Sequence, residues 1–465
     1  MALSSISFIF GALPVFLLLF YIFKPKYRIY LLFLFSACFY CVNDPDHIVL
    51  MIALITVNYA ISLTMLSESA QVRKWLLAAG VIIDLGVLFF YKYIGAFTGI
   101  GSLRFLSYQP KMMVGLSFLT FSFISYLADV YNNKITVPKN PVKFADYVLM
   151  FPKILMGPIA RYSDVADSLD KMTLKPGDIG NGSKRFMEGL FKKVIIADNL
   201  AVLVNLVNSS IDYSNTSVSS FWIGSVAYSL QLFFDFSGYS DMAIGLARMM
   251  GFELKENFDH PYLCNSFSDF WKRWHISLSE WFRDYVYIPL GGSRKSIPRN
   301  IFNLLIVWLL TGIWHGTGYA FICWGLVYFL MLVIERYIIK PARLNKLSGL
   351  LWRTVTLLVV NFNWVLFSHE KLKDGLKFFA GMFGFYHNPL CSASDIRYLR
   401  EFGLFLLLGI IFSCPVSDFF GNGIENKKIR KAASAVMPVI YIFLFVWALS
   451  FLLLGYHNPF MYQNF

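Results

Sequence analysis

Apolar residues are gathered into long blocks, and this patterning restricts the possible folds more than any other feature. Charged residues make up only 15% of the chain, against about 25% in soluble globular proteins. A helix needs about 20 residues to cross a bilayer, and the blocks do not alternate apolar and polar residues as strands of a membrane barrel do. We therefore predict an all-α polytopic membrane protein with about 11 transmembrane helices plus re-entrant or interfacial helices. The blocks are Ile6–Phe23, Ile48–Met65, Trp75–Tyr91, Val218–Phe234, Leu351–Asn363, Phe402–Cys414 and Ala435–Leu454.

The net charge of +13 fits the excess of Lys and Arg in cytoplasmic loops better than a nucleic-acid-binding function. The early loops alternate in charge. Lys24–Arg28 is basic, Asp44–Asp46 is acidic, and Arg73-Lys74 is basic again. This alternation predicts an extracytoplasmic N-terminus. The basic segment Lys427–Lys431 should also be cytoplasmic, so that the last span places the C-terminus outside.

The middle of the chain, 145–318, is less regular than its ends. In a bilayer, irregular backbone is tolerated only where protein or a water-filled cavity surrounds it, so the functional cavity is expected here. We divide the single membrane domain into N-terminal spans (1–135), a catalytic core (145–335), C-terminal spans (349–456) and an extracytoplasmic tail (456–465). The breaks in the middle segment are expected at Pro152, Pro158, Gly238, Gly245, Gly251, Pro261 and Pro289.

His315 is the one side chain in the 34-residue stretch Ile301–Ile334 that can become charged near neutral pH. A helix of that length would run about 51 Å at roughly 1.5 Å per residue, so Gly312, Gly316 and Gly318 predict a break beside the histidine. An imidazole, with a pKa of about 6.5, suits a general base at neutral pH. The alternative is a packing or turn histidine; the close glycines, which allow a backbone or substrate to approach, favour the functional interpretation.

A second histidine, His275, lies in the aromatic segment Phe267–Arg283, where apolar residues recur at helical spacing. We predict one continuous helix there, suited to an interface or a polar cavity wall. His275 is a candidate for catalysis, for positioning of substrate, or for a structural hydrogen bond. Its neighbours Lys272 and Arg273 either extend to lipid headgroups or meet the phosphates of an acyl donor.

Several carboxylates lie in or near apolar stretches, and an intramembrane Asp is a functional candidate. Asp235 and Asp241, in Phe234–Asp241, are the most unusual, although a helix cap after Gly238 would also explain Asp241. The chain has no G-x-S-x-G, P-loop or H-E-x-x-H motif, so an acyl-enzyme serine is unsupported. No metal-ligand spacing is present; we expect no metal and no tightly bound cofactor. The aromatic tail is by itself typical of an interfacial belt.

Together these residues resemble the membrane-bound O-acyltransferase family, and within it the bacterial alginate O-acetyltransferase branch. The similarity runs nearly end to end and in the same order, which makes the set of motifs specific where each one alone is not. The motifs are Phe39-Tyr40, Gly157–Tyr162, Phe236–Asp241, Asn257-Phe258 with Pro261-Tyr262, Phe270–Ser279, Ile288–Gly292 and Trp314-His315-Gly316.

The resemblance implies helices around a central tunnel in a bacterial cytoplasmic membrane. It implies that His315 is the essential histidine and His275 the second family histidine near the tunnel. The donor would be a cytoplasmic acyl thioester such as acetyl-CoA, and the acceptor an extracytoplasmic polysaccharide, served by a separate transferase of the SGNH-hydrolase-like type. Further candidates for donor or substrate binding are Trp314, Trp271, Trp274, Lys272, Arg273, Asp235 and Ser237.

The tail resembles the Y-x-x-x-F-x-Y-x-x-F ending of the small membrane partner in teichoic-acid D-alanylation, through Tyr456, Phe460, Tyr462 and Phe465. The resemblance implies that Tyr462 carries the acyl group. Two other classes stay open. A transporter would also have broken helices, but usually in two related halves, which the sequence does not show. A non-catalytic scaffold for a secreted transferase would need its tail and tolerate loss of His315.

Overall fold

The computed structural model describes residues 1–97, 110–416, 427–455 and 460, and every regular element in these residues is helical. Six of the described helices are long and apolar enough to cross a membrane: Pro45–Thr64, Ala70–Gly95, Ile297–His315, Tyr319–Arg343, Lys346–Phe367 and Val436–Leu453. The predicted all-helical membrane class is therefore confirmed. The total of about 11 spans stays a prediction; Ser7–Ile22 and Leu116–Tyr131 are apolar but shorter.

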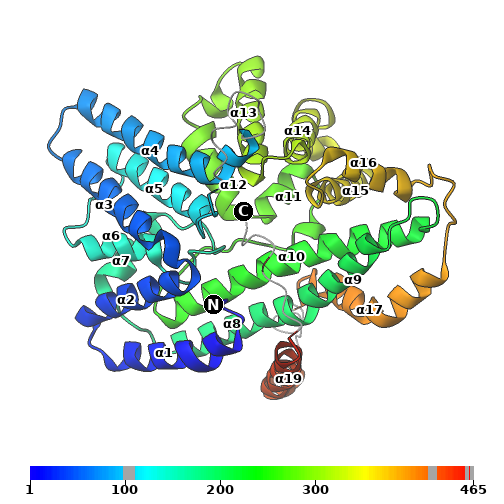
Figure 1. The fold of residues 1–465 in the computed structure, drawn as a ribbon, viewed down its shortest axis with the longest axis horizontal. Helices are drawn as coiled ribbons and strands as arrows, with labels where there is room; N and C mark the ends of the chain where they lie inside the picture. Colours follow the sequence, from blue (N-terminus) through cyan, green and yellow to red (C-terminus); the bar gives the residue numbers. More distant parts are fainter. Residues whose placement is uncertain (98–109, 417–426, 456–459, 461–465) are drawn as a thin grey trace.

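The N-terminal helices form one group, drawn in blue to cyan on the left of Figure 1. Proline at the first position starts two of them, where its missing N–H is not needed. Asn140 also caps the sixth helix by accepting a hydrogen bond from the Val142 amide at 3.0 Å. The group consists of α1 (Leu13–Ile22), α2 (Pro25–Asn43), α3 (Ile48–Thr64), α4 (Ala70–Phe97), α5 (Leu116–Tyr131), α6 (Pro141–Leu149) and α7 (Tyr162–Lys171).

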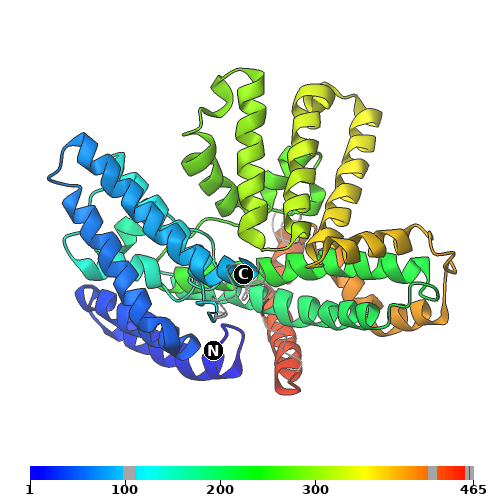
Figure 2. The same cartoon turned by 45° about the horizontal axis from the view of Figure 1, so that its top comes forward.

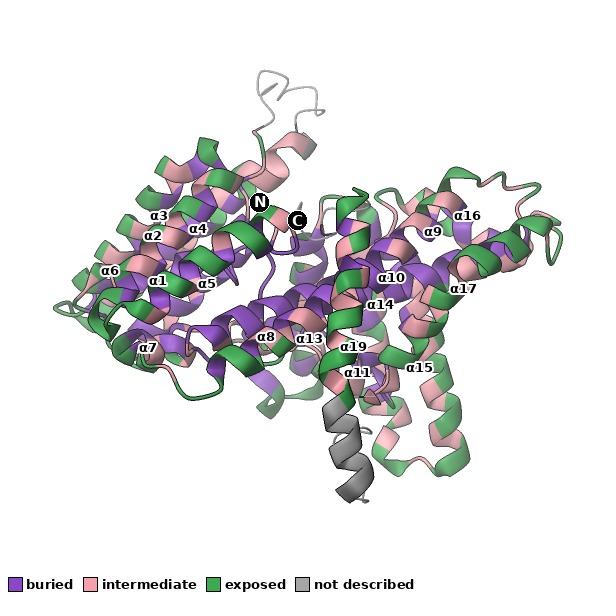
Figure 3. Cartoon of the chain, turned by 90° about the horizontal axis from the view of Figure 1, so that it is seen from below, coloured by how far each residue is buried: buried purple, intermediate pink, exposed green. Residues whose placement is uncertain are grey.

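The centre of the molecule is α10 (Val218–Met249), a 32-residue helix that is buried along most of its length (Figure 3). Beside it run α8 (Asp178–Phe191), the π-helical turn η4 (Lys192–Ala197) and α9 (Asp198–Ser209). The predicted breaks at Gly238 and Gly245 are wrong, because α10 passes through both without interruption. The cap proposed for Asp241 fails for the same reason.

Glycines instead allow α8 and α10 to pack in close contact. A Cβ on Gly189 would lie 2.4 Å from the carbonyl oxygen of Gly238, and one on Gly245 would lie 2.6 Å from that of Gly182. Gly182 and Gly189 lie seven residues apart on α8, as do Gly238 and Gly245 on α10. Both contacts therefore fall on one face of each helix. Small residues at such contacts let membrane helices approach until their backbones touch.

The remaining helices follow α10 in the sequence, and some of them pack against it. Figure 2 shows α13 to α15 standing next to one another, while α19 lies apart from them. They are α11 (Phe267–Arg273), α12 (Ile276–Phe282), η6 (Arg283–Tyr287), α13 (Ile297–His315), α14 (Tyr319–Ile334), α15 (Lys346–Phe367), α16 (Leu372–Met382), α17 (Ala393–Phe412) and α19 (Lys427–Leu453).

Candidate active site

His315 is the last residue of α13, and the chain turns at Gly316 before α14 begins. The break predicted beside this histidine is confirmed. The imidazole is only 4% exposed. Three aromatic rings meet it edge-on, with centroid distances of 4.7 Å to Trp314, 4.9 Å to Trp324 and 5.0 Å to Phe367. These rings fix the orientation of the imidazole and exclude bulk water from it.

Lys92, near the end of α4, reaches the end of α13 that carries His315. Its ammonium donates a hydrogen bond to the backbone carbonyl of Trp314, and Tyr93 donates one to the carbonyl of Ile313 at 2.7 Å. The last carbonyls of a helix have no intrahelical partner, and a cation is favourable there. Lys92 therefore places a positive charge beside the residue that precedes His315.

His275 is not part of a continuous helix, so that prediction is wrong. The helix stops after Arg273 and restarts at Ile276, and His275 between them has a left-handed backbone conformation, with φ of 45°. Asn257 holds this break. Its carbonyl accepts a hydrogen bond from the Ile276 amide at 3.0 Å, and its Oδ1 accepts one from the Ser277 hydroxyl at 2.8 Å.

The His275 imidazole is 1% exposed and lies edge-on to Phe236, with ring centroids 4.7 Å apart. Its Nδ1 is 3.2 Å from the Oδ1 of Asn257. Burial lowers the pKa of His275 to about 3, so this ring is neutral at physiological pH. A neutral ring bonded to an amide oxygen through Nδ1–H leaves Nε2 as an acceptor.

The predicted tryptophans form the aromatic wall around these histidines. Trp271 lies 4.7 Å from Trp308 of α13, and Trp274 lies 4.7 Å from Trp364 of α15, measured between ring centroids. The first pair is edge-to-face and the second is tilted, and aromatic pairs of this kind hold their partners in defined orientations. Trp271 and Trp274 therefore join α11 to the helices that carry and enclose His315.

The basic pair beside the tryptophans lies on the outer side of α11. Lys272 is exposed, and Arg273 pairs with Asp269 one turn earlier at 2.9 Å. Among the described residues no contact links either side chain to His275 or His315. Their proposed role in binding the donor stays a prediction.

Asp235 lies in the middle of α10 and forms a buried ion pair with Lys193 at 2.6 Å. Asp198 also pairs with this lysine, at 2.7 Å. Ser237, two residues further along α10, is buried, and its hydroxyl has no hydrogen-bond partner among the described residues. Asp235 thus has structural partners, and a role of Asp235 or Ser237 in binding the donor stays a prediction.

The tail returns to this same region. Phe460 is 2% exposed, and its ring lies 4.5 Å from the Lys193 ammonium and 5.0 Å from the Tyr239 ring. A cation over an aromatic face is attractive, and more so when both are desolvated. Tyr462, the predicted acyl carrier, lies outside the described residues, as do Tyr456 and Phe465.

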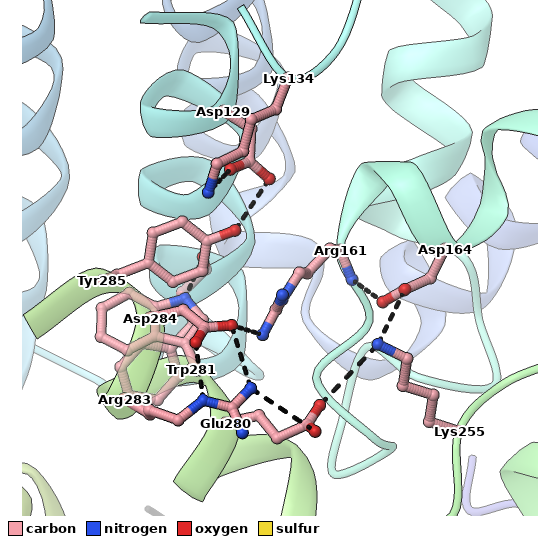
Figure 4. A network of polar contacts seen from close by, with 11 residues as sticks. Asp129, Lys134, Arg161, Asp164, Lys255, Glu280, Trp281, Arg283, Asp284 and Tyr285 are labelled. Atoms are coloured by element: carbon pink, nitrogen blue, oxygen red, sulfur yellow. Dashed lines mark hydrogen bonds and ion pairs between the residues drawn. The ribbon is translucent and has the colours of Figure 1, made fainter. Parts of the chain in front are cut away.

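A network of eight charged side chains ties α12 and η6 to α5 and α7 (Figure 4). Arg161 pairs with Asp284, and Lys255 bridges Asp164 at 3.0 Å and Glu280 at 3.8 Å. Four acids and four bases balance, so this network offers no net positive charge to an anionic donor. Its members are Asp129, Lys134, Arg161, Asp164, Lys255, Glu280, Arg283 and Asp284.

Sequence reasoning missed Lys92, Asn257 as the residue that holds His275, and the ion-pair network. Lys92 had a visible signal, since a lysine follows directly after the apolar block Trp75–Tyr91. Asn257 and the network depend on contacts between distant segments, which spacing along the chain does not show. In the part of the chain that the structure describes, no group of three His, Cys, Asp or Glu side chains could hold a metal ion.

Comparison with known proteins identifies the class. Residues 58–374 match the model of MBOAT, the membrane-bound O-acyltransferase family. The chain belongs to this family and is a membrane-bound acyltransferase. It is 39% identical to a probable alginate O-acetylase of Pseudomonas aeruginosa, over 94% of this chain and 85% of that protein.

Two further relatives act on different polymers. The chain is 34% identical to a peptidoglycan O-acetyltransferase of Helicobacter pylori, over 98% of this chain and 96% of that protein. It is 30% identical to a teichoic acid D-alanyltransferase of Bacillus subtilis, over 55% of this chain and 67% of that protein. Both names describe the transfer of an acyl group to a polymer of the cell envelope.

Proposed function

We propose that this protein takes an acetyl group from a cytoplasmic thioester, such as acetyl-CoA, and passes it across the bacterial cytoplasmic membrane for O-acetylation of a polysaccharide outside. The observation that carries the proposal is the enclosed His315 at the end of α13, with the Lys92 ammonium bonded to the backbone carbonyl of the preceding Trp314. Alginate-like exopolysaccharide and peptidoglycan are the two acceptors that the relatives' names support.

The chemistry assigned to His315 is general base catalysis. The imidazole takes the proton of the attacking hydroxyl as its oxygen bonds to the thioester carbonyl, and later returns a proton to the departing sulfur. His275, neutral and held by Asn257, positions the reacting groups. Burial suits this role, because a water-excluded site protects the acyl group from hydrolysis.

Tyr462 is proposed as the attacking hydroxyl. A phenol has a pKa of about 10, far below that of an alkyl alcohol, so an aryl ester remains activated and can pass its acyl group to a sugar. Phe460, two residues earlier, is seated against Lys193 and Tyr239 in the protein interior.

An extracytoplasmic transferase of the SGNH-hydrolase-like type is the proposed partner that completes delivery to the polymer. In this arrangement the C-terminus and N-terminus both lie outside, as the alternation of charged loops predicts. Accessibility of single cysteines placed after Leu454 and after Lys428 tests this orientation independently of activity. Labelling of both positions from the same side would contradict it.

The direct test is mass spectrometry of the purified full-length protein after exposure to isotopically labelled acetyl-CoA. We expect a labelled acetyl group on Tyr462. The matched variants are Tyr462→Phe, which should lose the label, and Tyr456→Phe in the same tail, which should keep it. Label on another residue in the wild-type protein would contradict the carrier, and no label with any acyl thioester would contradict the donor.

A further inference from the structure

Among the residues whose side chains the structure describes, two lysines are almost completely buried, and their surroundings differ. Lys193 has two carboxylates within 2.7 Å. Lys153, only 5% exposed, has none within 4.0 Å among the described residues. Its ammonium lies 3.5 Å from the Ser122 hydroxyl and 4.3 Å from the centre of the Tyr147 ring. Burial lowers the pKa of Lys153 to about 7, with the Asp164 carboxylate acting from beyond 4.0 Å, so an anion bound at this amine would favour its charged form.

Lys153 lies in the non-helical segment between α6 and α7, and this segment reaches the surroundings of both histidines. The amide of Ile159 donates a hydrogen bond to the hydroxyl of Ser277, two residues after His275, at 3.0 Å. On the other side, Ser122 follows Phe121, whose ring lies 5.2 Å from that of Trp314. Irregular backbone within a membrane protein is typical of a segment that lines a functional cavity.

The few charged and polar groups around Lys153 indicate which class of ligand fits there. One ammonium and one hydroxyl match a small monoanion, whereas a phosphate would need several donors to replace its hydration. Acyl transfer from a thioester produces one such monoanion, the thiolate that leaves the carbonyl carbon. We propose that Lys153 is the binding site of this leaving thiolate; the inference rests on the proposed function and adds a catalytic residue to it.

The acceptor oxygen bonds to the carbonyl carbon while its proton moves to His315, and the carbon–sulfur bond breaks with its electron pair remaining on sulfur. The thiolate pairs with the Lys153 ammonium, which keeps its own proton. Protonated His315 then gives its proton to the sulfur, so that the products are an oxygen ester and a free thiol.

Two donors with different leaving groups test this role in the full-length protein. S-acetyl-pantetheine releases a basic alkyl thiolate that needs stabilisation, whereas S-phenyl thioacetate releases a much less basic aryl thiolate that does not. We expect Lys153→Met to slow first-turnover thiol release about 10- to 100-fold with the alkyl donor and less than about 3-fold with the aryl donor, and Lys153→Arg to stay near the wild-type ratio. Charge-assisted hydrogen bonds have this size.

The ratio of the two rates on one preparation is independent of how much protein is folded. Equal slowing of the reaction with both donors would overturn the proposal. It would mean that Lys153 supports the structure or stabilises the carbonyl oxygen, and does not bind the leaving thiolate. An unchanged alkyl rate would overturn it too. His315→Asn should slow both donors equally. If the wild-type protein releases thiol from neither donor, the proposed function itself fails, which is a separate result.

Discussion

The Nδ1 atom of His275 lies 3.2 Å from the Oδ1 atom of Asn257, eighteen residues earlier in the chain. The same oxygen accepts a hydrogen bond from the Ser277 hydroxyl, and the Asn257 amide nitrogen donates to Ser240 on α10 at 3.2 Å. One buried amide therefore joins the break that carries His275 to the central helix. The hydrogen bond to Asn257 determines both the tautomer and the position of the His275 ring.

Replacing this amide should disturb the site without touching a histidine. Asn257→Ala leaves the Ser277 hydroxyl and the His275 ring without their acceptor, and an unsatisfied buried polar group costs about 1–3 kcal/mol. We expect acyl transfer to fall at least about 10-fold and thermal stability to fall with it. Asn257→Asp, which keeps the acceptor oxygen, should recover part of the rate. Equal rates for the Ala variant and the wild type would show that His275 needs no such support.

Local patterning was enough to predict the helical membrane class and the break beside His315. It failed where long-range packing decides the conformation. The apolar spacing of Phe267–Arg283 is truly helical on both sides of His275, but Asn257 bonds to the backbone of Ile276 and stabilises a left-handed residue between two helices. No spacing within the segment reveals that contact.

The predicted helix breaks at the glycines of α10 are wrong for a related reason. Gly238 and Gly245 read as breaks when the helix is considered alone, since glycine is a poor helix former. Opposite Gly189 and Gly182 of α8 they become contact positions, and the packing outweighs the propensity. Lys193 of η4 pairs with Asp235 of α10, and their sequence positions, 42 residues apart, give no sign of this contact.

The helix contact itself can be tested with two alanines on α8. Gly189→Ala places a methyl group 2.4 Å from the Gly238 carbonyl oxygen, whereas Gly180→Ala meets nothing within 4 Å. Overpacking typically costs about 1–3 kcal/mol, and an exposed helical Gly→Ala gains roughly 0.5–1 kcal/mol. Thermal unfolding in detergent should therefore show a lower midpoint for the first variant and a higher one for the second. A stabilised Gly189→Ala would refute the close contact.

Seating of the tail should control acylation of Tyr462. Phe460→Ala removes the ring that covers the Lys193 ammonium and contacts Tyr239, and cation–π pairs of this kind contribute roughly 1–2 kcal/mol when desolvated. We expect labelling of Tyr462 to slow about 5- to 30-fold. Phe460→Trp, which retains an aromatic face, serves as the control. Unchanged labelling in Phe460→Ala would mean that the tail reaches the site by another contact.

The ion-pair network predicts a pH-dependent part of the stability. Burial opposes ionisation of Asp284, but its pairs with Arg283 and Arg161 outweigh burial and hold its pKa below the ordinary value. A carboxyl with a lowered pKa in the folded state stabilises the protein above its unfolded pKa, about 3.9, and loses that contribution as the pH falls through the folded value. The difference in melting temperature between the wild type and Asp284→Asn should be maximal at pH 6 and should decrease below about pH 4. A difference that stays constant down to pH 3 would contradict the pairing.

The role of His315 is tested most directly by transfer of labelled acetyl groups from a thioester in proteoliposomes that contain the full-length protein. His315→Asn removes the proposed base, and His260→Asn, at a histidine paired with Asp259 at 3.1 Å, serves as the matched control. General base catalysis contributes about 10²- to 10⁴-fold, so we expect His315→Asn to lose transfer by at least that factor while His260→Asn transfers normally. Transfer by His315→Asn at the wild-type rate would contradict the mechanism.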